Sequence, residues 1–257
     1  MTLQALIFDV DGTLADTERD GHRPSFNLAF QEMGLDWFWD VSLYGELLSV
    51  TGGKERMLHY VTHYRSQDKD LPDLKERIAA LHRIKTRHYM ALMSRSAIPL
   101  RPGIRRLIEE ARASGITLAI ATTTTPENVT ALLTSTLGPE SPSWFKVIAA
   151  GDVVPAKKPA PDIYLWALER LGVPASSCLA FEDSDNGLKS ARAAGLTTLV
   201  TVNEYTAHQS FDGAAAIISD LGEAAVPYRR IQGPLPQQGI ITLESCRQLL
   251  MQQGVEG

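Results

Sequence analysis

Short apolar runs alternate with helical patterns along most of this 257-residue chain. The runs at residues 3–8, 117–121, 146–149, 178–181 and 197–200 are typical of buried β-strands. Between them, apolar residues recur at helical spacing, and a glycine often follows the last one. These helical sets are Ile104, Leu107, Ile108 and Ala111 before Gly115, then Val129, Leu132 and Leu133, then Tyr164, Leu165, Leu168 and Leu171 before Gly172, and Leu188, Ala191 and Ala194 before Gly195. Strands that alternate with helices predict an α/β fold with a doubly wound parallel sheet.

A long insert interrupts this alternation directly after the first predicted strand. Residues 17–97 show helical patterns only, so we predict an all-helical cap domain there. The core would then consist of residues 1–16 and 98–222. Residues 223–257 are predicted to be a C-terminal extension that ends in a weak helical pattern. The apolar positions of the longest cap pattern are Leu74, Ile78, Leu81, Tyr89 and Leu92.

Two carboxylates stand two residues apart where the first predicted strand ends. The apolar run up to Phe8 is followed directly by Asp9, Val10 and Asp11. Because side chains in extended chain alternate between faces, both acids would point to the same side. At about 4 Å and an effective dielectric near 20, two like charges repel by roughly 4 kcal/mol. A cation or a shared proton would offset this cost, so the pair predicts a catalytic site; the alternative is an acidic turn.

Three further polar clusters follow the next predicted strands of the core. Thr122 comes after the second strand, Lys157 and Lys158 after the third, and Glu182 and Asp183 after the fourth. The carboxyl ends of parallel strands meet at one edge of a sheet, where ligands bind. We therefore expect these clusters to lie close to the first acid pair. Taken singly, each has an ordinary alternative: a helix cap, a solvated lysine, or acids at a helix N-terminus.

Composition narrows the classes of function. Lys and Arg number 25 against 30 Asp and Glu, a net charge of −5, whereas nucleic-acid-binding proteins usually carry a basic excess. The first apolar run is too short to span a membrane and has no basic leader. The two cysteines are too few for a disulfide framework. We therefore expect no nucleic-acid or membrane partner, and a reducing cytoplasm or a plastid stroma-like compartment. Nothing in the sequence requires more than a monomer, so a monomer is expected.

The ordered set of motifs resembles the haloacid dehalogenase superfamily of phosphotransferases. The match runs from about residue 3 to residue 221, most of the chain. It rests on Asp9-Val10-Asp11-Gly12-Thr13, Thr122, Lys158-Pro159 and Glu182-Asp183-Ser184, each at the end of a predicted strand. The resemblance implies a Rossmann-like core with a helical cap between the first and second motifs. This agrees with the fold that the hydrophobic pattern predicts on its own.

The resemblance also implies how the motifs divide the work of phosphoryl transfer. Asp9 would be the nucleophile that attacks phosphorus and forms an aspartyl-phosphate. Asp11 would protonate the leaving sugar oxygen and then activate water. Thr122 would donate to a phosphate oxygen, and Lys158 would supply a positive charge. A Mg²⁺ ion would neutralise charge between the carboxylates and the phosphate. Its implied ligands are Asp9, the Asp11 backbone carbonyl and Asp183, with Glu182 in or near the shell.

A glycine-rich helix start with basic residues is the clearest feature of the predicted cap. Its sequence is Thr51-Gly52-Gly53-Lys54-Glu55-Arg56. Backbone N–H groups after the glycines, together with Lys54 and Arg56, predict an anion site that would hold a second phosphate of the substrate. The alternative is an ordinary helix start with two solvated basic residues.

Within the superfamily the chain resembles the CbbY-like proteins. The resemblance rests on residues 9–18, 51–56, 121–128 and 181–184. It implies hydrolysis of a phosphorylated sugar, xylulose-1,5-bisphosphate. Glu18 would bind sugar hydroxyls near the reacting phosphate. The distal phosphate would be bound by Gly52, Gly53, Lys54, Glu55 and Arg56, and the core side of the pocket would be lined by Thr125, Pro126, Glu127 and Asn128.

Three alternatives remain open from the sequence. A β-phosphoglucomutase-like sugar phosphate mutase shares the core and cap type, with a cap histidine that helps to hold the phosphoenzyme. Here Gly21 stands at the equivalent count and His22 one place later, which favours hydrolysis. His22 could then lie on the exposed side of the first cap helix, although slack in the loop would bring it back. A phosphoglycolate phosphatase would leave Lys54 and Arg56 with less to bind. An inactive binding or regulatory protein would usually lack one of the two catalytic acids.

Overall fold

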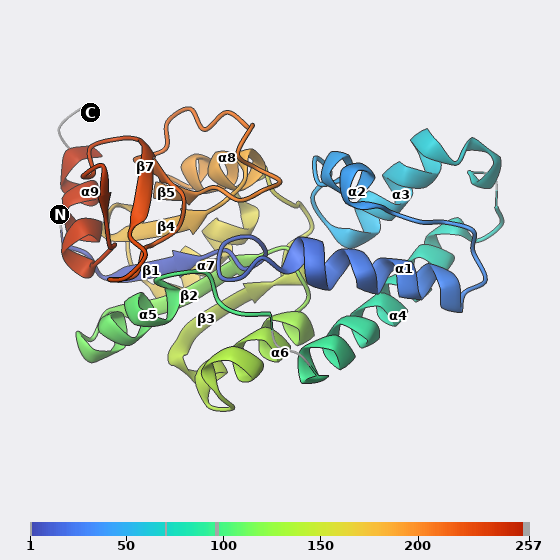
Figure 1. The fold of residues 1–257 in the computed structure, drawn as a ribbon, viewed down its shortest axis with the longest axis horizontal. Coiled ribbons are helices and arrows are strands. Elements are labelled where there is room, and N and C mark those ends of the chain that lie inside the picture. The colour runs from blue at the N-terminus through green and yellow to red at the C-terminus, as the bar shows by residue number, and fades with distance from the viewer. Residues whose placement is uncertain (1, 70, 96–97, 254–257) are drawn as a thin grey trace.

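The computed structural model describes residues 2–69, 71–95 and 98–253. Figure 1 shows two lobes, an α/β lobe that contains the first strand and the last helix, and a helical lobe beside it. The chain enters the helical lobe after its first strand and returns before its second. The helical lobe is therefore a single continuous insert into the α/β lobe.

An eight-stranded sheet forms the centre of the α/β lobe, in the order β3-β2-β1-β4-β5-β6-β7-β8. Neighbouring strands from β3 to β6 in this order run parallel, and β7 and β8 add an antiparallel edge. Each predicted strand overlaps an observed one, and the predicted fold class is confirmed. The strands are β1 (Ala5–Phe8), β2 (Thr117–Thr122), β3 (Phe145–Ala150), β4 (Cys178–Glu182), β5 (Thr197–Thr201), β6 (Ala216–Ile218), β7 (Tyr228–Gln232) and β8 (Gln238–Gly239).

The register of the central strands brings the motif residues together. Phe8, the last residue of β1, is paired with Ile120 of β2 and Phe181 of β4. Asp9 therefore leaves the sheet between the ends of these two neighbours. This is the carboxyl edge of the parallel strands, where doubly wound sheets bind their ligands.

Helices cover both faces of the sheet, as the alternation of buried side chains requires. Leu6 and Phe8 share one apolar cluster with α5 (Ile104–Ala113), α6 (Pro126–Leu137) and α9 (Leu243–Gln253). Ala5 and Ile7 point to the opposite face. There they pack with α7 (Asp162–Leu171) and α8 (Asp185–Ala193). Short 3₁₀ turns at Ser141–Trp144, Gly151–Val153 and Ala175–Ser177 complete the lobe.

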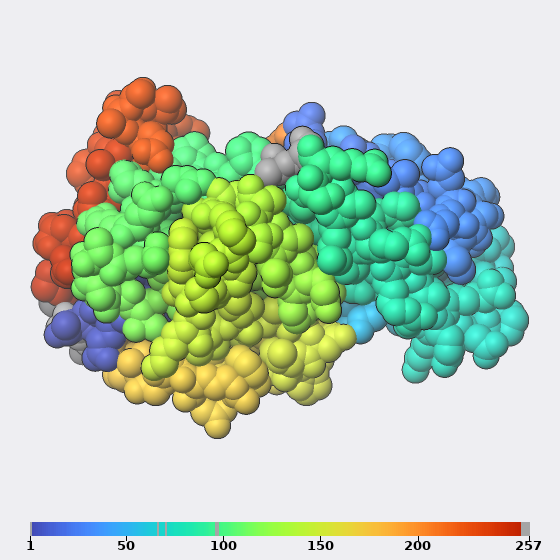
Figure 2. All heavy atoms as spheres, turned by 90° about the horizontal axis from the view of Figure 1, so that it is seen from below, coloured from blue at the N-terminus to red at the C-terminus, as the bar shows by residue number. Residues whose placement is uncertain are grey.

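The helical lobe is built around its own aromatic core. Its buried rings belong to Phe26, Phe30, Trp37, Trp39, Tyr44 and Tyr60. The lobe contains a π-helical turn at Glu18–His22, α1 (Arg23–Glu32), α2 (Val41–Leu47), α3 (Gly53–Tyr64), a 3₁₀ turn at Ser66–Asp68 and α4 (Leu74–Arg95). Figure 2 shows the two lobes in contact on the face seen from below, where α4 packs against α6. Within the described ranges, no helix combines the length and apolar character needed to cross a membrane.

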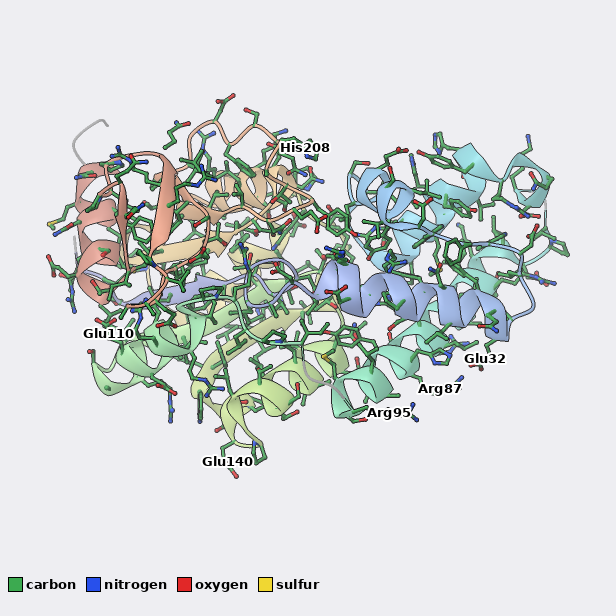
Figure 3. The ribbon with its side chains drawn as sticks, in the orientation of Figure 1. Glu32, Arg87, Arg95, Glu110, Glu140 and His208 are labelled. Atoms are coloured by element: carbon green, nitrogen blue, oxygen red, sulfur yellow. The ribbon has the colours of Figure 1, made fainter. Side chains whose placement is uncertain are left out.

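The C-terminal segment, which the sequence indicated only as an extension, is part of the core. Strand β7 pairs with β6, and buried side chains of α9 join the same apolar cluster as α5. The Arg106 guanidinium donates to the carbonyls of Leu221, Gly222 and Ile241. Glu110, labelled in Figure 3, accepts a hydrogen bond from the backbone N–H of Leu243 at the start of α9. These contacts attach the segment to α5.

Truncating a buried side chain of α9 tests this attachment. Leu249→Ala should lower the free energy of unfolding by about 2–5 kcal/mol, because Leu249 is buried in the core cluster. Met251→Ala, on the same helix but 48% exposed, should change it by less than about 0.5 kcal/mol. Urea denaturation followed by circular dichroism measures both values. Two equally small effects would show that α9 contributes nothing to the core.

Candidate active site

Lys158 is a buried cation at the carboxyl edge of the sheet. Its Nζ lies 2.7 Å from Asp9 Oδ1 and 2.6 Å from Glu182 Oε1, and its side chain is 4% exposed. Burial alone would lower the pKa of this amine, but the two carboxylates outweigh burial and raise it. The neighbouring Lys157 points elsewhere, with Nζ 2.7 Å from the Gly151 carbonyl and 2.7 Å from Asp152 Oδ1. The structure thus distinguishes the two lysines as the motif predicts.

Three buried carboxylates converge beside Lys158. One oxygen from each of Asp9, Glu182 and Asp183 lies within 4.8 Å of the others. Burial raises the pKa of Asp9 to about 8, against the opposing charge of Lys158 and with the help of Glu182 and Asp11. Burial, followed by the charges of Asp9 and Glu182, raises the pKa of Asp183 well above its ordinary value. A divalent cation would relieve this repulsion, and carboxylate oxygens are the ligands that Mg²⁺ prefers. The residues present therefore fit the predicted ion.

The three acids differ in what they face. Asp9 and Asp183 line a cavity between the two lobes, whereas Glu182 is wholly buried beneath them. Glu182 Oε1 accepts hydrogen bonds from Lys158 at 2.6 Å and from the Tyr164 hydroxyl at 2.5 Å. This arrangement suits a residue that holds the lysine.

Asp11, the second acid of the first motif, is bound by residues of the cap. Asp11 Oδ1 accepts a hydrogen bond from the Thr17 hydroxyl at 2.5 Å and lies 2.7 Å from His22 Nε2. The other ring nitrogen of His22 lies 2.6 Å from Lys85 Nζ. Lys85, His22 and Asp11 therefore form one chain of contacts that begins in α4 and ends at the core.

His22 is buried, at 3% exposure, so the expectation that it lies on the exposed side of its helix is wrong. The cause is the π-helical turn at Glu18–His22, in which the Arg23 N–H donates to the Glu18 carbonyl. An i→i+5 turn contains one more residue than an α-helical turn. His22 stands one position later than the histidine of the mutases, and the wider turn takes up this one-residue offset, so the His22 ring still points inward. Gly21 allows this packing, because a Cβ there would lie 2.9 Å from the side chains of Tyr89 and Ile98.

The two acids of the first motif have opposite pKa shifts. Burial raises the pKa of Asp11, but the charge and hydrogen bond of His22 and the hydrogen bond of Thr17 outweigh it and hold this pKa at about 2. The pKa of Asp9 is about 8. The environments thus separate the two pKa values. However, Asp11, the predicted proton donor, has the low pKa, and Asp9, the predicted nucleophile, has the high one. Asp11 needs a neighbouring negative charge before it can carry a proton.

Thr122 and the loop after β2 form the core side of the cavity. Thr122 is buried at the cavity wall, and its Oγ1 accepts a hydrogen bond from the Thr124 N–H at 3.3 Å. The helix cap is Thr125, which accepts from the Asn128 N–H at 3.4 Å. Thr122 is therefore not the cap of this helix, which was the alternative to a contact with phosphate.

Glu18 and Arg56, which the resemblance assigned to opposite ends of the substrate, lie side by side on the cap side of the cavity. The Arg56 Nη1 donates to the Tyr44 hydroxyl at 2.9 Å, and this hydroxyl donates to Glu18 Oε2 at 2.5 Å. Arg56 is almost fully buried, and its guanidinium lies 3.8 Å from Glu18. Sequence reasoning missed Tyr44, which belongs to no motif and carries only the apolar signal of a core residue.

A second pocket adjoins the cavity toward the cap helices α3 and α4 and shares Asp11, Glu18, Arg56 and Thr123 with it. Gly52 and Gly53 line this second pocket from the predicted glycine-rich segment, and Thr125 and Asn128 line it from the core. His82 and Lys85 of α4, which sequence reasoning also missed, line the same region. Burial, with the charges of Lys85 and Lys54, lowers the pKa of His82 to about 3, so this ring is neutral. In the sequence, His82 and Lys85 stand out only as polar positions within the helical pattern of the cap.

Four of the predicted substrate-binding residues are absent from the described cavity walls. Lys54 points to the core instead, where its Nζ lies 2.5 Å from Asp152 Oδ2. Pro126 and Glu127 face a separate groove between α4 and α6. Glu55 lies against Gly52 at the start of α3. A role of these residues in binding substrate stays a prediction.

Polar contacts hold the cap against the core. Besides the Lys54–Asp152 pair, Arg19 Nη1 lies 2.7 Å from Glu204 Oε2, and Asn186 donates to Thr51 Oγ1 at 3.1 Å. In Figure 3, by contrast, the labelled Glu32 and Arg87 lie at the outer side of the cap, far from the junction of the lobes. The described conformation therefore has the cap closed over the acid–lysine centre, the group formed by Asp9, Glu182, Asp183 and Lys158.

Known proteins resemble this chain over most of its length. The family model of the haloacid dehalogenase-like hydrolases matches residues 3–195. The chain belongs to this family. It is 53% identical to the protein CbbY of Cupriavidus necator over 225 residues, which is 88% of each chain.

Two solved structures extend the comparison. An aspartate-to-asparagine variant of CbbY from Rhodobacter sphaeroides, in complex with xylulose-1,5-bisphosphate, has a TM-score of 0.80 and 48% identity, and the match covers 87% of this chain and 98% of that one. A β-phosphoglucomutase from Clostridium difficile has a TM-score of 0.75 at 18% identity over 99% of this chain and 100% of that one, a likeness of fold alone. These matches confirm the predicted family, its CbbY-like branch and the enzyme class, a phosphatase.

The raised pKa of Asp9 predicts how the stability of the metal-free protein depends on pH. Its pKa is 3.8 ordinarily and about 8 in the folded protein, so the folded state holds an extra proton between these values. The contribution of Asp9 to stability should therefore fall as pH rises from about 4 to about 8, whereas His82 contributes in the opposite sense below about pH 6.5. Asp9→Asn should reduce this fall by at least about 1 kcal/mol between pH 5 and 8 in urea denaturation with EDTA. The exposed Asp20→Asn is the control, and equal pH slopes in wild type and Asp9→Asn would contradict the prediction.

Proposed function

We propose that this protein is a Mg²⁺-dependent phosphatase that hydrolyses a sugar bisphosphate, xylulose-1,5-bisphosphate, through an aspartyl-phosphate on Asp9. The observation that carries the proposal is a cavity arrangement. The acid–lysine centre borders one pocket, Gly52, Gly53 and Lys85 line an adjoining pocket, and Arg56 lines both. A substrate with phosphates at both ends matches this distribution of charge. The complex of the related CbbY protein with xylulose-1,5-bisphosphate supports the same substrate.

In this proposal Asp9, Asp183 and the Asp11 carbonyl would hold the metal ion, while Glu182 holds Lys158. When bound, Mg²⁺ neutralises charge on the carboxylates and on the phosphate. Asp9 Oδ attacks phosphorus, the bond from phosphorus to the sugar oxygen breaks, and Asp11 gives its proton to that oxygen. A water molecule then attacks the acyl-phosphate, Asp11 takes its proton, and inorganic phosphate and the free Asp9 carboxylate result.

Lys158 and Thr122 stabilise this reaction from fixed positions. Lys158 already donates to Asp9 at 2.7 Å, so its charge is in place before substrate enters. Thr122 offers its hydroxyl hydrogen to a phosphate oxygen from the cavity wall. A phosphate dianion beside Asp11 raises the pKa of that acid by like-charge repulsion, which supplies the protonated form that the first step needs.

The cap selects the substrate. Arg56 is held by Tyr44 and Glu18, so its guanidinium is oriented without ordering a mobile side chain. Glu18 lines both parts of the cavity and can accept hydrogen bonds from sugar hydroxyls. Asn128 Oδ1 is buried with no hydrogen-bond partner among the described residues, so it offers a further acceptor.

A sugar phosphate mutase is the second candidate, because one observation favours it. In the sequence, the one-residue offset of His22 argued against a mutase. In the structure, His22 Nε2 nevertheless lies 2.7 Å from Asp11 Oδ1. A histidine that holds the Asp11 carboxylate toward the cap, away from the attacking water, would slow hydrolysis of the aspartyl-phosphate. Hydrolysis remains the first proposal, since the mutase in the comparison shares the fold alone.

Steady-state kinetics with a substrate panel tests the proposal. Xylulose-1,5-bisphosphate should be hydrolysed with a kcat/KM at least about 10-fold above those for phosphoglycolate and an aryl phosphate, because only the bisphosphate reaches both ends of the cavity. Asp9→Asn or removal of Mg²⁺ should abolish phosphate release. Conversion of β-glucose 1-phosphate to glucose 6-phosphate would support the mutase instead. No turnover of any phosphate ester would contradict both enzymes.

Arg56 and Lys54 should differ in their effect on the bisphosphate. Arg56→Gln should raise KM for the bisphosphate roughly 10- to 100-fold, since a hydrogen bond to a charged group contributes about 1.5–3 kcal/mol. The KM for an aryl phosphate should stay within about 3-fold. Lys54→Gln should have a smaller effect, because Lys54 is paired with Asp152. Equal changes for both substrates would contradict a distal-phosphate role for Arg56.

A further inference from the structure

Arg101 lies where the chain returns from the cap to the core. Its backbone N–H donates to the Leu14 carbonyl at 2.8 Å, and the preceding Leu100 forms an antiparallel bridge with Ala15. The outgoing and returning connections of the cap are therefore joined at this residue. Arg101 belongs to none of the sequence motifs and does not line the cavity that contains Asp9 and Asp183.

The guanidinium of Arg101 is buried and donates mainly to backbone carbonyls. Nη1 donates to the carbonyl of Gly12 and to that of Thr201, the latter at 3.1 Å. Nη2 donates to the carbonyls of Val202 at 2.6 Å and Ser219 at 2.7 Å. Residue 101 is 8% exposed. One side chain thus fastens the loop after β1 to the ends of β5 and β6.

Both fastened loops contact Asp183 directly. Asn203, the residue after Val202, donates from Nδ2 to Asp183 Oδ2 at 2.7 Å. Gly12 lies so close that a Cβ added there would be 2.3 Å from the same oxygen. Asp183 is therefore enclosed between two loops whose separation Arg101 sets. On the first loop, Gly12 follows Asp11, whose carbonyl is part of the proposed metal site.

We propose that Arg101 is a positioning residue for the divalent metal site. It holds the Asp11–Gly12 loop and Asn203 at the spacing in which Asp183 and the Asp11 carbonyl can bind one ion. The inference rests on the proposed function for the presence of the metal site. Outer groups that orient metal ligands typically change metal affinity 10- to 100-fold when they are replaced.

The shape of arginine explains why this position suits no smaller cation. Guanidinium presents five N–H donors in a rigid plane, whereas an ammonium group presents three around a point. The carbonyls of Gly12, Val202 and Ser219 come from three separate segments and are reached at once by the two Nη atoms. A lysine at this position would leave some of these buried carbonyls without a hydrogen-bond donor.

The test is direct binding of Mn²⁺ to the full-length protein without any sugar phosphate, followed by electron paramagnetic resonance of the free ion. Arg101→Lys should raise the Mn²⁺ dissociation constant at least about 10-fold. Arg106→Lys is the matched control, because Arg106 also donates to backbone carbonyls but fastens the C-terminal segment. It should leave the dissociation constant within about 2-fold of wild type. Equal Mn²⁺ affinity in Arg101→Lys and Arg106→Lys would overturn the proposal.

A second variant decides the question if Arg101→Lys does not fold. Asn203→Ala removes the amide that contacts Asp183 and leaves the Arg101 contacts in place, so it should also raise the Mn²⁺ dissociation constant. The double variant, where it folds, should lose less affinity than the product of the single effects, because both changes act on the same carboxylate. An unchanged dissociation constant for Asn203→Ala, or fully independent effects, would overturn the inference. Absence of Mn²⁺ binding by wild type would instead defeat the proposed metal site itself.

Discussion

The contact of the Lys158 ammonium with Asp9 and Glu182 is the interaction on which the rest of the structure depends. It joins the third and fourth motifs to the nucleophile and offsets part of the charge of three buried carboxylates. Without it, acids within 4.8 Å of one another would repel in a medium with little water. The remaining negative charge favours a divalent cation. The same charge balance prepares the site for a phosphate, since the cation and the lysine are placed before substrate arrives.

Much of the core followed from local patterns. The apolar runs predict the strands, and the topology of alternating strands and helices brings their carboxyl ends to one edge. This is enough to place Asp9, Thr122, Lys158 and Asp183 in one site without knowledge of any side-chain contact. The choice between Lys157 and Lys158 came from the resemblance to the family, and the structure agrees because only Lys158 reaches Asp9.

What the sequence did not predict depends on contacts between distant segments. The inward turn of His22 requires a π-helical turn, which hydrophobic periodicity does not distinguish from an α-helix. Strand β7 has the sequence Tyr-Arg-Arg-Ile-Gln, in which only Tyr228 is buried, so it lacks an apolar strand pattern. The partner of Lys54 is an acid of the other lobe and follows only from cap closure. Arg101 gave no signal, because its partners are backbone carbonyls.

The most direct test of the acid–lysine centre is a crystal structure of the protein with Mn²⁺, measured at a wavelength where the ion scatters anomalously. The account predicts one strong anomalous peak in contact with the carboxylates of Asp9 and Asp183, with Lys158 still bound to Glu182. A peak elsewhere in the molecule, or none at saturating Mn²⁺, would contradict it.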